Sequence, residues 1–178
     1  MQNFLIVVDM QNDFVTGSLG SEDAKSIVDN VVSRVKYGED LGEIIIFTRD
    51  THDDDYFNTQ EGKKLPVSHC VKNTQGWQII PELKGLASNK MIIDKPTFGS
   101  LELMQLIKKA NETEPVGEVT LLGLCTDICV ISNAMLIKNA LPEITVKVDA
   151  SCSAGVSKQS HNNALSAMKS CQIEVVNE

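Results

Sequence analysis

The stretch Leu121-Leu-Gly-Leu-Cys-Thr-Asp-Ile-Cys129 places an apolar run directly before a compact turn and a helix-like segment. The run is typical of a buried β-strand, and Thr126 is a residue type that caps helix N-termini. Cys129 then lies about one turn inside the predicted helix, among backbone N–H groups without an intrahelical partner. Because such groups and the helix dipole favour negative charge, we expect the position to stabilise a thiolate. The alternative is a cysteine that serves as a small buried apolar residue.

Similar strand and helix patterns precede and follow this stretch. The predicted strands cover residues 3–9, 43–49, 90–94, 118–124, 144–148 and 172–176. Predicted helices, with apolar residues at helical spacing, begin near Ser21, Ser100, Thr126 and Lys158. Between residues 50 and 76 the chain is polar and irregular. The alternation predicts an α/β fold with a six-stranded parallel sheet and helices on both faces.

Composition and length exclude several classes of protein. A chain of 178 residues fits one domain, residues 1–178. Its net charge of −8, with no basic stripe, argues against nucleic acid and anionic membrane as partners. No apolar run approaches the ~20 residues that span a bilayer, and no basic flank of a signal peptide is present, so we expect a cytoplasmic protein. The five cysteines contain no CxxC pair, which argues against a disulfide framework.

Four ionisable or nucleophilic side chains follow successive predicted strands: Asp9, Asp50, Lys95 and Cys129. Ligands of parallel sheets bind beyond the carboxyl ends of the strands, so these side chains would share one edge. Asp9 alone is compatible with a turn residue, and Lys95 alone with a solvated lysine. Together they predict a nucleophilic cysteine beside an ammonium and a carboxylate that takes the thiol proton. The backbone N–H groups of Cys125 and Cys129 are candidates for binding an oxyanion.

A set of metal-ligand residue types lies in the polar segment after the second predicted strand. Asp50 and His52, two positions apart on extended chain, share one side, and His69 follows in the same segment. A carboxylate and two imidazoles suit zinc, iron or manganese, with the remaining positions open to water. The alternative is an exposed loop of ordinary polar residues. His161, the third histidine, receives no role.

These motifs resemble, in their order along the chain, those of the isochorismatase-like cysteine hydrolases. They are Asp9-Met-Gln-Asn-Asp-Phe14, Asp50-Thr-His52, His69-Cys-Val71, Lys95-Pro-Thr-Phe98 and Gly123-Leu-Cys-Thr-Asp-Ile-Cys-Val130. The metal-ligand residues make the chain more similar to nicotinamidases than to isochorismatases. The resemblance implies a six-stranded parallel sheet covered on both faces, and a cis peptide bond between Leu124 and Cys125.

The resemblance also implies roles for individual residues. Asp9 would be the base, Lys95 the electrostatic stabiliser and Cys129 the nucleophile. A divalent metal, with zinc the first expectation and iron or manganese as alternatives, would be bound by Asp50, His52 and His69, with Glu61 as a further candidate ligand. Phe14 would form one wall of the substrate pocket. Trp77 is a candidate for a second wall, and its alternative is a place in the core.

The implied reaction is hydrolysis of a small amide through a thioester, with nicotinamide as the first expected substrate. Nicotinamidases commonly have an aromatic residue just before the His-Cys motif, whereas this chain has Leu65-Pro-Val-Ser68. Another small amide or a ureido compound is therefore an alternative substrate. A binding protein that keeps the fold without turnover is a further alternative. By analogy with relatives we expect a homo-oligomer.

Overall fold

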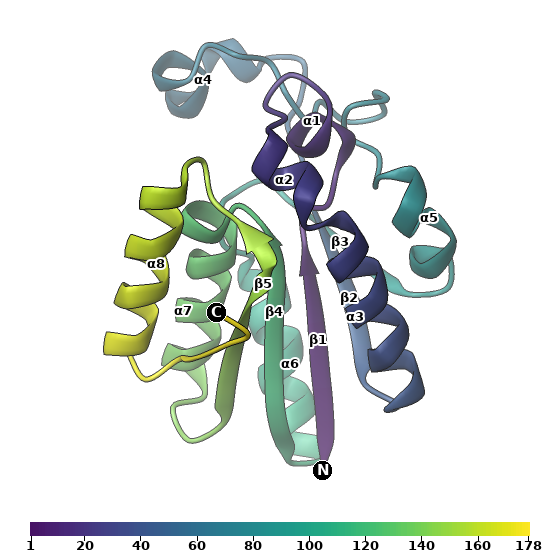
Figure 1. Cartoon of the computed structure of the whole chain (residues 1–178), viewed down its shortest axis with the longest axis vertical. Helices are drawn as coiled ribbons and strands as arrows, with labels where there is room; N and C mark the ends of the chain where they lie inside the picture. Colours follow the sequence, from purple (N-terminus) through teal and green to yellow (C-terminus); the bar gives the residue numbers. More distant parts are fainter.

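The computed structural model describes residues 1–178 and contains one sheet of six strands, in the order β3-β2-β1-β4-β5-β6 (Figure 1). The strands are β1 (Gln2–Val8), β2 (Ile44–Asp50), β3 (Met91–Lys95), β4 (Val116–Leu124), β5 (Thr145–Ala154) and β6 (Glu174–Val176). All neighbouring strands are parallel. The six-stranded parallel sheet predicted from the sequence is therefore confirmed.

Helices cover both faces of this sheet. One face carries α6 (Leu101–Thr113), α7 (Ile131–Ala140) and α8 (Lys158–Ser170), and the other carries α2 (Glu22–Ser26), α3 (Val28–Asp40) and α5 (Pro81–Ala87). In β1 the side chains of Phe4, Ile6 and Val8 join the first core, whereas Leu5 and Val7 join the second. Because successive side chains of a strand point to opposite faces, a continuous apolar run is what a strand buried on both faces requires. No helix is both long and apolar enough to cross a membrane.

The helices differ from the sequence pattern in two ways. One predicted helix is divided in two, and several short helices are not predicted at all. The helix predicted from Ser21 is divided into α2 and α3 at Ile27. The polar segment after β2 contains η1 (Tyr56–Asn58) and α4 (Gln60–Lys64), and α1 (Asn12–Val15) follows β1. A single turn is too short to produce a periodic apolar pattern, so these helices are not predictable from periodicity. In Figure 1, α1 and α4 lie beyond the carboxyl ends of the strands.

The order of strands reverses between β1 and β4, which are neighbours at the centre of the sheet. At such a point the loops leave toward opposite faces, and a crevice opens between them. Gly123, near the end of β4, has φ +116°, and a Cβ at this position would lie 2.1 Å from the carbonyl oxygen of Val8. Only glycine permits so close an approach. The approach brings Asp9 next to the turn that follows β4.

Candidate active site

Three of the predicted side chains meet in this crevice. The Lys95 Nζ atom lies 2.7 Å from Asp9 Oδ2 and 3.4 Å from Cys129 Sγ. All three residues are buried. Asp50 Oδ1 lies 3.6 Å from the same ammonium. The ends of β1, β2 and β3 and the turn after β4 thus contribute one residue each, at the sheet edge where the sequence predicts them.

The buried charges of this cluster shift one another's pKa values. Burial by itself lowers the pKa of Lys95, but the negative charge of Asp9 beside it gives a net rise, so the ammonium stays charged. Burial raises the pKa of Asp9, and the attraction of Lys95 offsets only part of this rise. Thr48 donates a hydrogen bond of 2.6 Å to Asp9 Oδ1 and fixes the carboxylate. A carboxylate with a raised pKa is a stronger base toward a thiol than an ordinary aspartate.

The surroundings of Cys129 act on the pKa of its thiol in opposing directions. Burial raises the pKa of the Cys129 thiol well above its ordinary value, and the charge of Asp9 raises it further, although Lys95 lowers it. The net shift favours the protonated thiol, and Asp9 is the neighbouring candidate base. The sequence indicates the helix end and the neighbouring ammonium, but not the loss of water around the sulfur, which is a property of the fold.

Cys129 lies on a π-helical turn, η2 (Thr126–Val130), and α7 begins only after it. A cis peptide bond joins Leu124 to Cys125 immediately before the turn, as the resemblance implies. Cys125 also lines the cavity described below, and its backbone N–H donates no hydrogen bond within the chain. This N–H is therefore free to bind an oxyanion formed beside Cys129.

The turn is held by side-chain contacts that the sequence pattern does not predict. Thr126 does not cap the helix as expected: the cap residue is Cys125, and the Thr126 hydroxyl instead lies 2.8 Å from His161 Nδ1. Asn133 Nδ2 donates a hydrogen bond of 2.8 Å to the Cys129 carbonyl. Both contacts join residues of the turn to other parts of the fold or to the next helical turn. For His161, the only signal in the sequence is its place near the start of a predicted helix.

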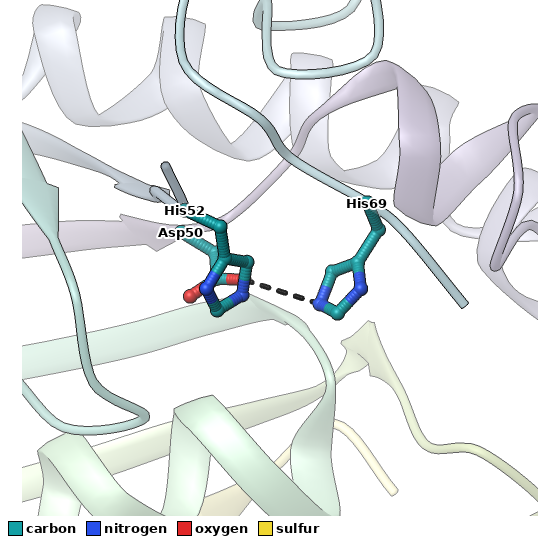
Figure 2. Close-up of side chains that lie close together, drawn as sticks. All are labelled: Asp50, His52 and His69. Carbon is teal, nitrogen blue, oxygen red and sulfur yellow. Dashed lines mark ion pairs between the residues drawn. The ribbon is translucent and has the colours of Figure 1, made fainter. Parts of the chain in front are cut away.

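Asp50, His52 and His69 converge beside this cluster, with their ligand atoms all within 4.8 Å of one another (Figure 2). Asp50 Oδ2 lies 3.0 Å from His52 Nε2 and 3.5 Å from His69 Nε2. Burial raises the pKa of Asp50, but the two neighbouring imidazoles and the positive charge of Lys95 more than reverse this, so the net pKa is lowered and the group is a carboxylate. The predicted ligand set therefore assembles from two separate segments.

The geometry of these residues fits a divalent metal ion. His69 Nδ1 lies 2.8 Å from the Val67 carbonyl, a contact that places the proton on Nδ1 and leaves a lone pair on Nε2. His52 Nε2 is buried without an aligned hydrogen bond. Ligands at about 2.0–2.2 Å from a tetrahedral ion lie roughly 3.4 Å apart, close to the distances between these atoms. Glu61 Oε1, on α4, lies 3.7 Å from Nε2 of each histidine and faces the same point.

A shell of buried contacts positions the ligands. Gln11 holds the backbone of Asp50 on both sides: its Nε2 donates to the Asp50 carbonyl at 2.9 Å, and its Oε1 accepts the Asp50 N–H at 2.7 Å. Asp13 Oδ2 accepts the N–H of Cys70, the residue after His69, at 2.8 Å. The ring of Tyr56 packs against both ligand imidazoles. Rigid support of this kind keeps metal ligands in place.

A cavity of about 890 Å³ opens onto both groups of residues. Its lining includes Phe14, His52, His69, Phe98, Cys125 and Cys129. Phe14 thus lies where the sequence predicts an aromatic wall. Phe98 was not predicted to line the pocket, although it closes the quoted motif Lys95-Pro-Thr-Phe98. A second aromatic wall is therefore provided by Phe98.

Trp77 does not line this cavity, so the expectation of a second wall at that position is not met. The indole is buried, and its Nε1 donates to Thr51 Oγ1 at 2.8 Å. The guanidinium of Arg49 lies 3.5 Å from the ring centroid. The alternative interpretation of Trp77 as a core residue is correct, because the indole is buried against Arg49 and Thr51 at the end of β2.

A pair of variants separates these two aromatic roles. Trp77→Ala should lower the free energy of unfolding by about 3–5 kcal/mol through loss of buried contacts, with little change in KM for a small amide. Phe98→Ala removes a side chain that is 46% exposed, so it should change stability by less than about 1 kcal/mol while raising KM several-fold. Urea unfolding and steady-state kinetics measure both effects. A large change of KM in Trp77→Ala with unaltered stability would contradict the core role of Trp77 and indicate that the indole contacts the substrate.

The sequence is similar to one protein family and to several of its characterised members. Residues 3–177 match the Isochorismatase domain family. The nicotinamidase/pyrazinamidase of Mycobacterium tuberculosis is 27% identical over 188 residues, which cover 97% of each chain. The nicotinamidase of Schizosaccharomyces pombe is 25% identical over 206 residues, covering 98% of this chain and 92% of the relative.

Solved structures show the same relationship. A nicotinamidase/pyrazinamidase from Bacillus subtilis superposes with a TM-score of 0.87 at 28% identity, covering 99% of this chain and all of that one, 100%. A pyrazinamidase of Pyrococcus horikoshii in complex with zinc gives a TM-score of 0.82 at 28% identity, with 100% of both chains covered. The match spans nearly every residue, including all the motifs quoted above, and so this chain belongs to the Isochorismatase domain family.

Proposed function

We propose that this protein is a metal-containing cysteine amidohydrolase that converts nicotinamide into nicotinate and ammonia. The observation that carries the proposal is the buried contact of Lys95 Nζ with Asp9 Oδ2 at 2.7 Å and with Cys129 Sγ at 3.4 Å, at the floor of a cavity that also contains Asp50 and two histidines. The family and its nicotinamidase relatives support the choice of substrate.

The first half of the reaction forms a thioester. Asp9 takes the proton of the Cys129 thiol, and the sulfur attacks the carboxamide carbon. The developing oxyanion is bound by the backbone N–H groups of Cys125 and Cys129. Lys95 stabilises the negative charge on the sulfur and on Asp9 throughout. Asp9 then returns the proton to the leaving nitrogen, and ammonia departs.

The second half releases the acid. Asp9 accepts a proton from a water molecule, whose oxygen attacks the thioester carbon. The C–S bond breaks, the thiolate of Cys129 takes back the proton held by Asp9, and the acid leaves as nicotinate with its own proton released to water. Asp50, His52 and His69, with Glu61 as a fourth candidate, would hold a divalent ion, for which zinc is the first choice. When bound, such an ion would supply a Lewis acid that orients the substrate ring through its nitrogen, directly or through water.

Ammonia release from nicotinamide is the direct test. Purified protein loaded with zinc should release ammonia and nicotinate in equal amounts. Complete chelation should lower kcat/KM by at least about tenfold, because the ring loses its anchor, and added metal should restore it. The matched variant His69→Ala should lose bound metal in parallel, as measured by elemental analysis. No ammonia from fully loaded protein would reject this substrate.

The size of the cavity favours a second candidate within the same chemistry. About 890 Å³ is near the upper end of the range for small-molecule pockets, and the segment before His69 contributes Leu65 to the lining instead of an aromatic side chain. A larger amide or a ureido compound would fill more of this space. Comparison of kcat/KM over a panel of nicotinamide, pyrazinamide, longer aliphatic amides and N-carbamoyl compounds would rank the candidates. The highest value with a larger amide would replace nicotinamide as the substrate.

A further inference from the structure

The turn that carries Cys129 has a polar contact to α8 that the reaction described above does not use. Thr126, the second residue after the cis bond, is fully buried, and its hydroxyl lies 2.8 Å from His161 Nδ1. The neighbouring Asp127 accepts the backbone N–H of Val156 at 3.0 Å. Two consecutive residues of the turn are thus attached to the start of α8 by their side chains.

The start of α8 is itself firmly built. Ser157 and Ser160 form a reciprocal capping box, which satisfies two backbone N–H groups at the first turn of the helix. The preceding Gly155 packs so closely that a Cβ there would lie 2.9 Å from Asp127 Oδ1 and 2.9 Å from the backbone nitrogen of His161. Burial lowers the pKa of His161, which favours the neutral ring, and Nδ1 of that ring can accept a hydrogen bond from the Thr126 hydroxyl. The imidazole is therefore held on a rigid element.

The position of this contact gives it significance for the reaction. Thr126 is the next residue after Cys125, whose backbone N–H is free to bind the oxyanion. The orientation of Thr126 therefore affects the position of that N–H. A donor of this kind acts only if it is held within about 0.5 Å of its working position. We propose that His161 is a positioning residue that fixes the oxyanion-binding turn through the Thr126 hydroxyl. The expected effect of His161 on kcat depends on the proposed function, whereas its expected effect on the order of the turn does not.

The kinetic test compares His161→Leu with the unaltered protein, both loaded with zinc. His161→Leu should lower kcat for nicotinamide about tenfold and leave KM and metal content within twofold, because the oxyanion forms only after binding. His161→Asn can place an amide group near Nδ1 and should recover most of the loss. Asn162→Ala, at the exposed neighbouring position, is the control and should be unaltered.

An aldehyde probe reports the oxyanion site more directly. Addition of the Cys129 thiol to pyridine-3-carbaldehyde forms a C–S bond, and the former carbonyl oxygen becomes a hydroxyl or oxyanion in the proposed site. His161→Leu should weaken inhibition by this aldehyde about tenfold, whereas inhibition by nicotinate should change less than twofold. Thr126→Val should cause a similar loss, and the double variant should lose no more than either single variant. Additive losses would contradict a role for the hydrogen bond.

Amide hydrogen exchange separates this inference from the proposed function. Exchange in residues 124–130 should become at least about tenfold faster in His161→Leu than in the unaltered protein or in Asn162→Ala. Faster exchange in a protein that releases no ammonia from nicotinamide would reject nicotinamide as the substrate but support the role of His161 in fixing the turn. Unaltered exchange, kcat and aldehyde inhibition in a protein that does release ammonia would overturn the role of His161 alone.

Discussion

Replacement of Cys129 by alanine should lower the rate of amide hydrolysis by more than about 10⁴-fold, because no other group in the cavity can form the thioester. Cys125 also lines the cavity, but burial raises the pKa of its thiol to about 12, and Lys95 contacts the sulfur of Cys129. The variant should still bind substrate and metal, since neither is held by the sulfur. Ammonia release under saturating nicotinamide measures the loss.

The same variant should remain folded. Cys129 is buried, and its replacement removes one sulfur atom from the packed interior, which should change the melting temperature by no more than about 2–4 °C. Cys152→Ala is the matched control, because Cys152 is buried in β5 and does not line the cavity. The control should keep full activity. Turnover retained in Cys129→Ala would refute the assigned nucleophile, whatever the control shows.

Lys95→Met should destroy both activity and a large part of the stability. Lys95 is 1% exposed and forms an ion pair with the fully buried Asp9. Methionine fills similar space but leaves the Asp9 carboxylate buried without its ammonium, which costs about 3–5 kcal/mol. For a chain of this size the melting temperature should fall by roughly 6–20 °C. The rate should fall at least about 10³-fold, because the negative charge on the sulfur is no longer stabilised.

A double variant separates these two effects of Lys95. Asp9→Asn together with Lys95→Met removes the stranded charge, so much of the lost stability should return. Activity should not return, because an amide cannot accept the thiol proton. Calorimetry and ammonia release on the single and double variants provide the comparison. A double variant as unstable as Lys95→Met would show that the ion pair is not the source of the loss.

The order of apolar runs and polar strand ends was sufficient to predict the sheet and one rim of the site. In β1 a run that is apolar on both faces can only be buried on both faces, which requires helices on each side. Asp9, Asp50 and Lys95 follow their strands directly, and parallel strands deliver such residues to one edge. The candidate metal-binding set Asp50, His52 and His69 was predictable from residue type and spacing, because a carboxylate with two imidazoles is a ligand set that divalent transition metals accept.

Contacts between distant segments were not predictable in this way. The protonation of Cys129, the burial of Trp77 against Arg49 and the pairing of Thr126 with His161 depend on packing that joins loops far apart in the chain. A sequence pattern indicates which side chains are apolar along one element, but not how much water a charged group loses when two elements pack together. The sequence by itself therefore determined the sheet and the set of reactive groups. The tertiary structure decided their ionisation, the second pocket wall and the support of the turn, because desolvation and hydrogen bonding are set by neighbours in space.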